Sequence, residues 1–170
     1  MISLVGLPGS GKSTVGRQLA RRLQLPFFDA DQAIEQRLGC SIRAYFERDG
    51  EESFRDVEES VLADLTEQPS GVISTGGGAV LRAANRRRLR ERSQVVYLNS
   101  SPDELFRRLR HDVNRPLLQV ADPRGRLRDL HALRDPLYRE TAHFIVDTGR
   151  PSVATLVNMI VMQLELAGTL

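Results

Sequence analysis

The feature that most constrains the fold of this chain is a glycine-rich octet near its start, Gly6-Leu7-Pro8-Gly9-Ser10-Gly11-Lys12-Ser13. It matches the pattern G-x-x-x-x-G-K-[ST], in which backbone N–H groups surround phosphates and the lysine reaches the outer ones. Among 24 lysine and arginine residues, Lys12 is the only lysine. A compact ammonium suits this position better than a planar guanidinium. The octet therefore predicts a bound nucleoside triphosphate. The predicted contacts are Gly9, Ser10, Gly11, Lys12, Ser13 and Thr14.

The residues around the octet predict the structure that the motif requires. Ile2-Ser3-Leu4-Val5 is a short apolar strand, and residues 14–23 place Val15, Leu19 and Leu23 on one helical face. A helix that begins at the loop adds its dipole and free N–H groups to the anion site. The alternative is a glycine-rich turn without a ligand, which explains neither the lysine nor a serine hydroxyl suited to magnesium.

The composition is that of one ordinary globular domain. The chain has 170 residues, of which 41% are hydrophobic and 27% charged. No apolar run approaches the roughly 20 residues that span a bilayer, and no signal-peptide pattern is visible. Cys40 is the only cysteine, which excludes an internal disulfide and a cysteine-based zinc site. We expect a cytoplasmic monomer that binds no membrane.

A cluster of arginines raises the question of nucleic-acid binding. Its members are Arg82, Arg86, Arg87, Arg88, Arg90 and Arg92. The net charge is only +2, and no aromatic residues are interleaved with these arginines. We favour the alternative, the solvated face of a helix that buries Ala83, Ala84 and Leu89. No nucleic-acid partner is predicted.

Strands and helices alternate along the whole chain. Strands are expected at 2–5, 26–29, 71–75, 94–98 and 143–147, and helices at 14–23, 31–38, 41–48, 51–67, 82–92, from 102, at 128–140 and from 152. This alternation predicts an α/β fold of three layers, with a five-stranded parallel sheet covered by helices on both faces. The irregular stretch 112–126 is expected to be a mobile lid. A single domain over 1–170 is predicted, since neither a second domain nor an internal repeat is visible.

Ligands of such sheets bind beyond the carboxyl ends of the strands, and two aspartates stand there. Ser13 is the expected ligand of Mg²⁺, and Asp29 or Asp31 could hold a magnesium-bound water, because Mg²⁺ usually keeps several waters. The other acid could orient or deprotonate an acceptor hydroxyl. Either aspartate could instead cap the following helix, and both roles can coexist.

Glycines and arginines at other places indicate an acceptor. Gly76-Gly77-Gly78 ends a strand and lets the backbone approach a ligand closely. Arg55 and Arg134 stand beside apolar residues, where an arginine can clamp a carboxylate, although a surface ion pair also explains either one alone. Arg115 lies in the predicted lid. It could neutralise charge on the transferring phosphate, or it could be an ordinary exposed arginine.

Together these residues resemble the shikimate kinases, small members of the nucleoside-monophosphate-kinase-like group of P-loop kinases. Beyond the octet, the ordered motifs are Phe28-Asp29-Ala30-Asp31, Phe54-Arg55, Thr75-Gly76-Gly77-Gly78-Ala79-Val80, Arg115-Pro116-Leu117-Leu118 and Arg134-Asp135-Pro136-Leu137-Tyr138. The octet alone is common, whereas this ordered combination is much more specific. The resemblance implies the sheet order 2-3-1-4-5 and transfer of phosphate from ATP, with Mg²⁺, to the 3-hydroxyl of shikimate.

The resemblance also implies roles for single residues. Asp31 would hold the shikimate hydroxyls, acting as a base or only orienting one of them. Arg55 and Arg134 would bind the carboxylate, the backbone at Gly76–Gly78 would contact the ring substituents, and Asp29 would help to hold magnesium through a water. The acceptor would thus bind among the helices of about 31–67.

Further roles concern the supporting and nucleotide-binding residues. Glu58 would support Arg55 from the same helix face. Arg115 would be the lid arginine, catalytic together with Lys12 and Asp31. Arg108 would stack on adenine, although Arg107 and Arg110 are close enough to compete for that place. Pro151 stands about two positions earlier than the family pattern, so no adenine contact is assigned there.

Other functions explain fewer of these residues. A related small-molecule kinase, such as a gluconate kinase, does not predict both Arg55 and Arg134 around a triple-glycine turn. A nucleoside monophosphate kinase should carry arginines for two phosphates and a larger lid. A nucleotide-dependent regulatory module without catalysis would not need Lys12, Asp31 and Arg115 together.

Overall fold

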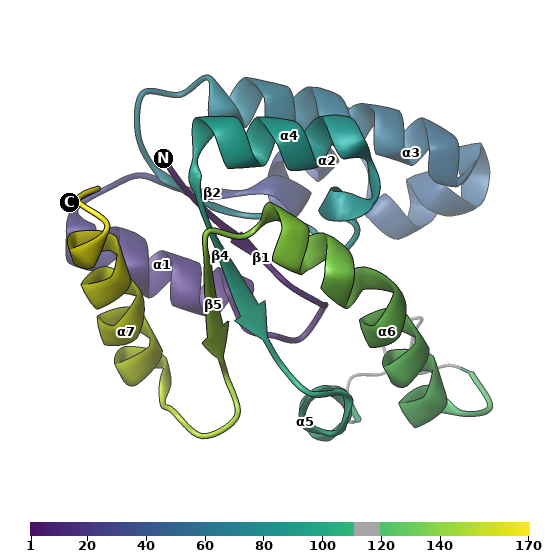
Figure 1. Ribbon diagram of the computed structural model, residues 1–170. Helices are drawn as coiled ribbons and strands as arrows, with labels where there is room; N and C mark the ends of the chain where they lie inside the picture. The colour runs from purple at the N-terminus through teal and green to yellow at the C-terminus, as the bar shows by residue number, and fades with distance from the viewer. Residues whose placement is uncertain (111–119) are drawn as a thin grey trace.

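The computed structural model describes residues 1–110 and 120–170. Five short strands form one parallel sheet in the order β2-β3-β1-β4-β5 (Figure 1). They are β1 (Ile2–Val5), β2 (Phe27–Asp29), β3 (Val72–Ser74), β4 (Gln94–Asn99) and β5 (Phe144–Asp147). Ile2 pairs with Val72 on one side and with Gln94 on the other, so the central strand is β1. The predicted fold class and strand order are confirmed.

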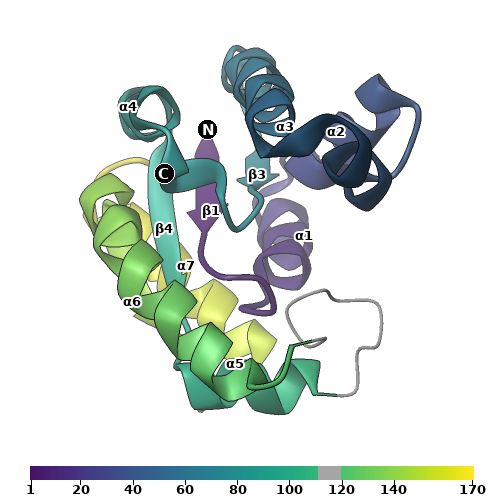
Figure 2. The same cartoon turned by 90° about the vertical axis from the view of Figure 1, so that its right-hand side faces the viewer.

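Helices cover both faces of this sheet (Figure 2). They are α1 (Lys12–Leu23), α2 (Ala30–Leu38), α3 (Ile42–Thr66), α4 (Ala83–Arg92), α5 (Pro102–Leu109), α6 (Pro123–Thr141) and α7 (Val153–Leu166), with the 3₁₀ turn η1 (Ala79–Leu81). On one face α1 and α7 pack against Leu4, Val96 and Val146. On the other face α4, α5 and α6 pack against Val5, Val95 and Tyr97. These strands are therefore apolar on both sides, as expected for a covered parallel sheet.

Helix α3 contains a break at Gly50. Gly50 has φ 85° and ψ 172°, a conformation that interrupts the helix and suits glycine. The helices predicted at 41–48 and 51–67 are the two parts of α3 on either side of this residue. The second part carries Phe54 and Glu58 into the interior.

Helix α6 begins earlier than the sequence pattern suggested. The irregular stretch was expected to run to residue 126, but α6 starts at Pro123. The Asp122 side chain caps it by accepting a hydrogen bond from the N–H of Gly125 at 3.1 Å, and Pro123 occupies the first helical position. Gly125 is therefore part of the capped first turn of α6. Residues 111–119, including the predicted lid arginine Arg115, lie outside the described residues.

The buried face of the arginine-rich helix α4 differs from the predicted one. Asn85 and Leu89 are buried, whereas Ala83 and Ala84 are exposed, because Asn85 donates to the carbonyl of Ala79 at 3.0 Å. Several arginines on and before this helix are engaged with other helices. Arg82 pairs with Asp56, Arg86 with Glu140, and Arg92 with Glu67. Across residues 1–110 and 120–170, no helix is both long enough and apolar enough to cross a membrane.

Candidate active site

The phosphate loop connects β1 to α1 and opens into a cavity of about 340 Å³. Gly9 and Gly11 have φ of 86° and 94°, left-handed values that glycine adopts without strain. The Lys12 side chain is buried, and its Nζ donates to the carbonyls of Gly6 at 2.7 Å and Leu7 at 2.9 Å. Because α1 begins at Lys12, the N-terminal N–H groups of that helix also face the loop. The cavity therefore has the features of a phosphate-binding site.

Ser13 and Asp29 present two oxygen atoms to the same cavity. Ser13 Oγ donates to Asp29 Oδ2 at 3.1 Å. The other carboxylate oxygen, Oδ1, accepts from the N–H groups of Asp31 at 3.0 Å and Gln32 at 3.3 Å, which caps α2. Asp29 is thus the capping aspartate, and its second oxygen still faces Ser13. A hydroxyl and a carboxylate fit Mg²⁺, which takes few protein ligands and keeps waters and phosphate oxygens. In the described ranges no cluster of three or more acidic, His or Cys residues forms a dedicated metal cage.

A second cavity of about 250 Å³ adjoins the first. Four residues line both cavities: Pro8, Asp31, Gly76 and Gly77. The remaining polar lining of the second cavity is Arg55, Glu58, Gly78, Arg126 and Arg134. A ligand in each cavity would therefore meet the other across this shared wall.

Two arginines, Arg55 and Arg134, line the second cavity. Arg55 Nη1 donates to Glu58 Oε1 at 2.8 Å, and Glu58 is almost completely buried. Within the described residues, the buried Nε atoms of Arg55 and Arg134 have no hydrogen-bond partner. Two guanidinium groups at one small cavity suit an anionic ligand, because arginine and carboxylate are well matched. Burial raises the pKa of Glu58, while the adjacent Arg55 charge acts in the opposite direction.

The triple-glycine turn packs so closely that side chains would not fit. A Cβ at Gly76 would lie 2.8 Å from Asp31 Oδ1, and one at Gly77 would lie 2.7 Å from Pro8 Cδ. A Cβ at Gly78 would collide with the guanidinium of Arg55. This backbone therefore packs against Pro8 and against Asp31 and Arg55, two of the predicted acceptor residues, and its contact with a ligand stays a prediction.

Asp31 lies where the two cavities meet. It is open to both of them, yet the protein around its carboxylate desolvates it. This desolvation, and then the charge of Asp29, raise the pKa of Asp31, with Lys12 opposing them. A carboxylate with a raised pKa at this position is suited to orient a hydroxyl or accept its proton.

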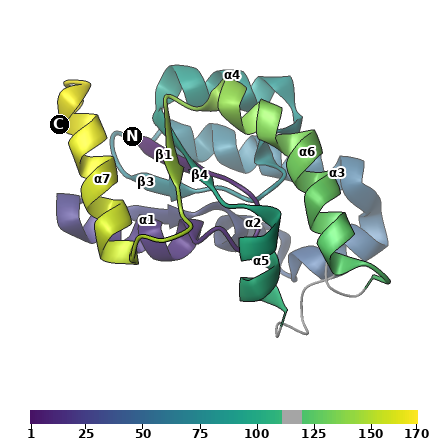
Figure 3. The same cartoon turned by 60° about the horizontal axis from the view of Figure 1, so that its bottom comes forward.

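Arg108 connects the phosphate loop to the segment after β5. Its guanidinium donates to the carbonyls of Gly9 at 3.1 Å and Thr148 at 3.2 Å, and it pairs with the buried Glu104 at 2.5 Å. Of the three arginines weighed from the sequence, Arg108 is the one that makes these contacts beside the nucleotide-binding loop. Helix α5, which carries it, lies beside the start of α6 (Figure 3).

Two residues near the second cavity, called the acceptor cavity below, had no role predicted from the sequence. Arg126 lines the cavity from the first part of α6, and the Tyr138 hydroxyl donates to the carbonyl of Gly77 at 2.5 Å. A helical signal existed for Arg126, since residues 126, 130 and 134 are spaced by four and all line the cavity. Because the expected lid was extended to residue 126, Arg126 was not assigned to this helix.

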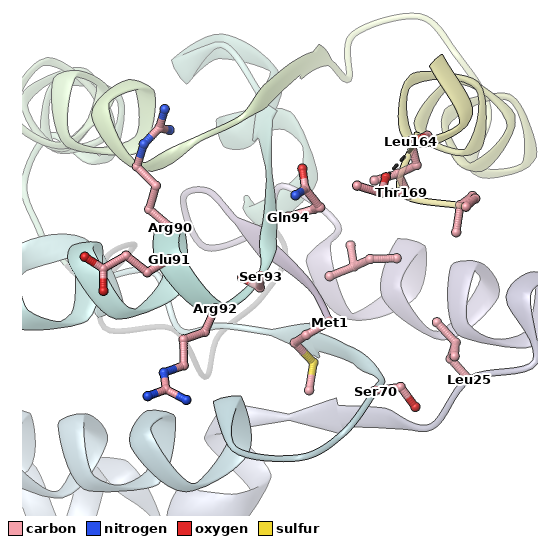
Figure 4. Close-up of a pocket in the computed structure, with 12 residues that line it drawn as sticks. Met1, Leu25, Ser70, Arg90, Glu91, Arg92, Ser93, Gln94, Leu164 and Thr169 are labelled. Carbon is pink, nitrogen blue, oxygen red and sulfur yellow. Dashed lines mark hydrogen bonds between the residues drawn. The ribbon is translucent and has the colours of Figure 1, made fainter. Parts of the chain in front are cut away.

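A larger cavity of about 440 Å³ lies at the amino-terminal edge of the sheet, between β1, β4 and α7 (Figure 4). The guanidinium groups of Arg90 and Arg92 point away from its centre (Figure 4). Arg90 donates to the carbonyl of Ala142 at 2.9 Å, and Arg92 pairs with Glu67. The charged groups around this cavity do not converge on a common point, so the cavity lacks the features of a binding site for a charged ligand.

Two adjoining cavities, one for phosphates and one for a small anion, on this sheet are what a P-loop kinase of small molecules requires. A sequence model of the shikimate kinase family matches residues 8–165. The shikimate kinase of Paracidovorax citrulli is 63% identical over 170 residues, covering 98% of this chain and 93% of its own. That of Ralstonia nicotianae is 58% identical over 98% of this chain and 88% of its own. The chain belongs to the shikimate kinase family.

Solved structures agree with this assignment. The shikimate kinase of Acinetobacter baumannii in complex with shikimate has a TM-score of 0.92 and 46% identity, over 99% of this chain and 94% of the other. The shikimate kinase of Aquifex aeolicus has a TM-score of 0.85 and 35% identity, over 96% and 95%.

Proposed function

We propose that this chain catalyses the reaction of its family, transfer of the γ-phosphoryl group of ATP to the 3-hydroxyl of shikimate, giving shikimate 3-phosphate and ADP. One observation carries the proposal. Arg55 and Arg134 line a cavity that shares Asp31 and Gly77 with the phosphate cavity. A small carboxylic acid held by these arginines has its hydroxyl at the shared wall, next to the phosphate loop.

The donor half of the site holds ATP. The N–H groups of the loop and the Lys12 ammonium contact the phosphates, and Arg108, already bonded to the Gly9 carbonyl, lies beside the adenine. Ser13 would hold Mg²⁺ directly, and Asp29 would hold it through a water; the ion supplies neutralisation of charge on the phosphate oxygens. The fit rests on the two oxygens that these residues place 3.1 Å apart.

The acceptor half places the hydroxyl. Arg55 and Arg134 bind the carboxylate, and the backbone of Gly76–Gly78 contacts the ring substituents. Asp31 accepts a hydrogen bond from the reacting hydroxyl and orients it toward the γ-phosphate. Phosphoryl transfer depends mainly on such positioning, so Asp31 need only orient the hydroxyl, and can take its proton as the new bond forms. Arg115, in the predicted lid, is proposed to neutralise charge on the transferring group.

The test is an assay of ADP release. The protein is incubated with Mg-ATP and, separately, with shikimate, gluconate or a nucleoside monophosphate. We expect ADP release that is stimulated by shikimate and by neither of the other two acceptors, and the absence of shikimate-dependent ADP release would contradict the proposal. A gluconate kinase, the nearest alternative, would instead respond to gluconate. We further propose that the enzyme is a cytoplasmic monomer that binds neither membrane nor nucleic acid.

A further inference from the structure

Tyr138 connects two parts of the acceptor cavity without lining it. It lies on α6 one turn after Arg134 and is completely buried. Its hydroxyl donates to the main-chain carbonyl of Gly77 at 2.5 Å, and the charge of Arg134 opposes the rise that burial causes in the pKa of the phenol. Tyr138 therefore joins the triple-glycine turn to the helix that carries a proposed carboxylate-binding arginine.

The two groups joined in this way come from different layers of the fold. Gly77 follows β3 and lines both cavities, whereas Arg134 belongs to α6 on the outside of the sheet. A Cβ at Gly77 would lie only 3.3 Å from Arg134 Nη1, so the turn and the guanidinium are close neighbours. Gly77 and Arg134 are far apart in the sequence, so the distance between them depends on non-covalent contacts. The hydrogen bond from Tyr138 to Gly77 is one such contact between α6 and the turn.

We propose that Tyr138 is a positioning residue for the acceptor: its hydroxyl fixes the triple-glycine turn relative to Arg134 and so determines how well the cavity fits a small carboxylic acid. The inference rests on the proposed function and deepens it. Tyr138 acts through Gly77 and Arg134, and it touches neither substrate nor the reacting atoms. Loss of the hydroxyl should therefore weaken acceptor binding and leave nucleotide binding intact.

Tyr97 provides a matched control. Its ring packs on that of Tyr138, with centroids 4.9 Å apart, and it is equally buried. Its hydroxyl donates to Asp135 Oδ1 at 2.7 Å, and Tyr97 lines neither cavity. Replacing either tyrosine with phenylalanine keeps the ring and removes the hydrogen bonds of its hydroxyl, to Gly77 from Tyr138 and to Asp135 and Asn99 from Tyr97. Only the Tyr138 hydroxyl contacts the acceptor cavity's wall.

The experiment compares Tyr138→Phe with Tyr97→Phe in steady-state kinetics and thermal unfolding. We expect Tyr138→Phe to raise the KM for shikimate about tenfold, the upper range for the loss of one buried hydrogen bond, with the KM for ATP within about twofold. Tyr97→Phe should lower Tm to a similar extent and leave both KM values within about twofold. The effect of Tyr138→Phe should not vary between pH 6 and 9, because burial raises the pKa of Tyr138 to about 12.

A double variant tests the route of the effect. If Tyr138 acts through Arg134, adding Tyr138→Phe to Arg134→Gln should change the shikimate KM by less than about twofold. Equal rises of both KM values in Tyr138→Phe, equal effects of the two single variants on shikimate, or full additivity in the double variant would each overturn the inference. Failure of the proposed function is distinguishable, since it would appear as a wild-type protein without shikimate-dependent ADP release.

Discussion

Arg55 and Glu58 lie one turn apart on α3, and Arg55 Nη1 donates to Glu58 Oε1 at 2.8 Å. Their side chains are only 11% and 2% exposed. Glu58 thereby holds the guanidinium of Arg55, a residue that lines the second cavity. The supporting role expected for Glu58 from the sequence has the geometry that it needs.

Glu58→Gln should weaken acceptor binding and leave the stability of the ligand-free fold nearly unchanged. The change removes the counter-charge that holds the Arg55 guanidinium, and we expect the shikimate KM to rise about tenfold. Burial raises the pKa of Glu58, so its charge does not stabilise the fold at neutral pH, and the free energy of unfolding should fall by less than about 0.5 kcal/mol. Kinetics and denaturant unfolding measure the two effects. Glu51→Gln is the control, because Glu51 pairs with the same arginine at 3.4 Å but is 56% exposed. The shikimate KM should change by less than about twofold there, and equal rises in both variants would contradict the prediction.

Arg134→Ala should damage use of shikimate far more than binding of ATP. Two charge-assisted hydrogen bonds to a carboxylate would be lost, so kcat/KM for shikimate should fall about 100-fold, with the KM for ATP within about twofold. Arg139→Ala is the control on the same helix, since Arg139 bonds Asp135 at 2.9 Å and lines neither cavity. The role of Arg134 is wrong if ATP and shikimate affinities fall equally.

Asp31→Asn should abolish most activity and leave the ligand-free fold as stable or more stable. The pKa of Asp31 is raised in the folded protein, so folding favours its protonated form. That contribution is present below the unfolded pKa and is lost as pH rises through the folded pKa. At neutral pH the charged carboxylate therefore weakens the fold, and Asn relieves this. Thermal unfolding at pH 7.5 checks the sign, and a Tm clearly below wild type would contradict it.

The same titration predicts the acidic limb of activity. An ionised Asp31 accepts a stronger hydrogen bond from the acceptor hydroxyl and can take its proton, so kcat/KM for shikimate should fall as pH decreases through the raised pKa of Asp31. The profile is measured at saturating Mg-ATP, against the binding of ADP at each pH. If ADP binding weakens in parallel with kcat/KM as the pH falls, the titrating group lies in the nucleotide half of the site and the prediction is wrong.

Arg126→Gln should affect acceptor capture in a salt-dependent way. Arg126 is exposed at the cavity lining, where a charge attracts an anionic acceptor through solvent. We expect the shikimate KM to rise about threefold at low ionic strength and the difference to disappear near 0.5 M salt. Arg128→Gln on the same helix is also exposed and outside the lining, and should have no effect. A salt-independent rise would indicate a direct contact instead of steering.

Local patterns predicted much of this molecule. The strand, the glycine loop and the helix after it are specified within 25 residues, so the phosphate site could be recognised from sequence. Parallel strands bring their carboxyl ends together, which predicted that Asp31 and Gly76–Gly78 would meet. The strand order came from the family resemblance, since alternation alone permits other orders.

What the sequence did not predict depends on the rotation of helices about their axes. Whether Arg108 or a neighbour reaches Gly9 is decided by the packing of α5, and Tyr138 meets Gly77 only because α6 lies beside the turn. The early start of α6 was readable in Asp122-Pro123, a capping signal outweighed by the surrounding arginines and glycine.

The wall shared by the two cavities has a thermodynamic consequence. Pro8, Asp31, Gly76 and Gly77 belong to both, so a ligand that orders this wall from one side changes the surface offered to the other. Linkage makes such an effect reciprocal: whatever factor the nucleotide contributes to acceptor affinity, the acceptor must return to nucleotide affinity. Any coupling through this wall would therefore act equally on both half-sites, whichever substrate binds first.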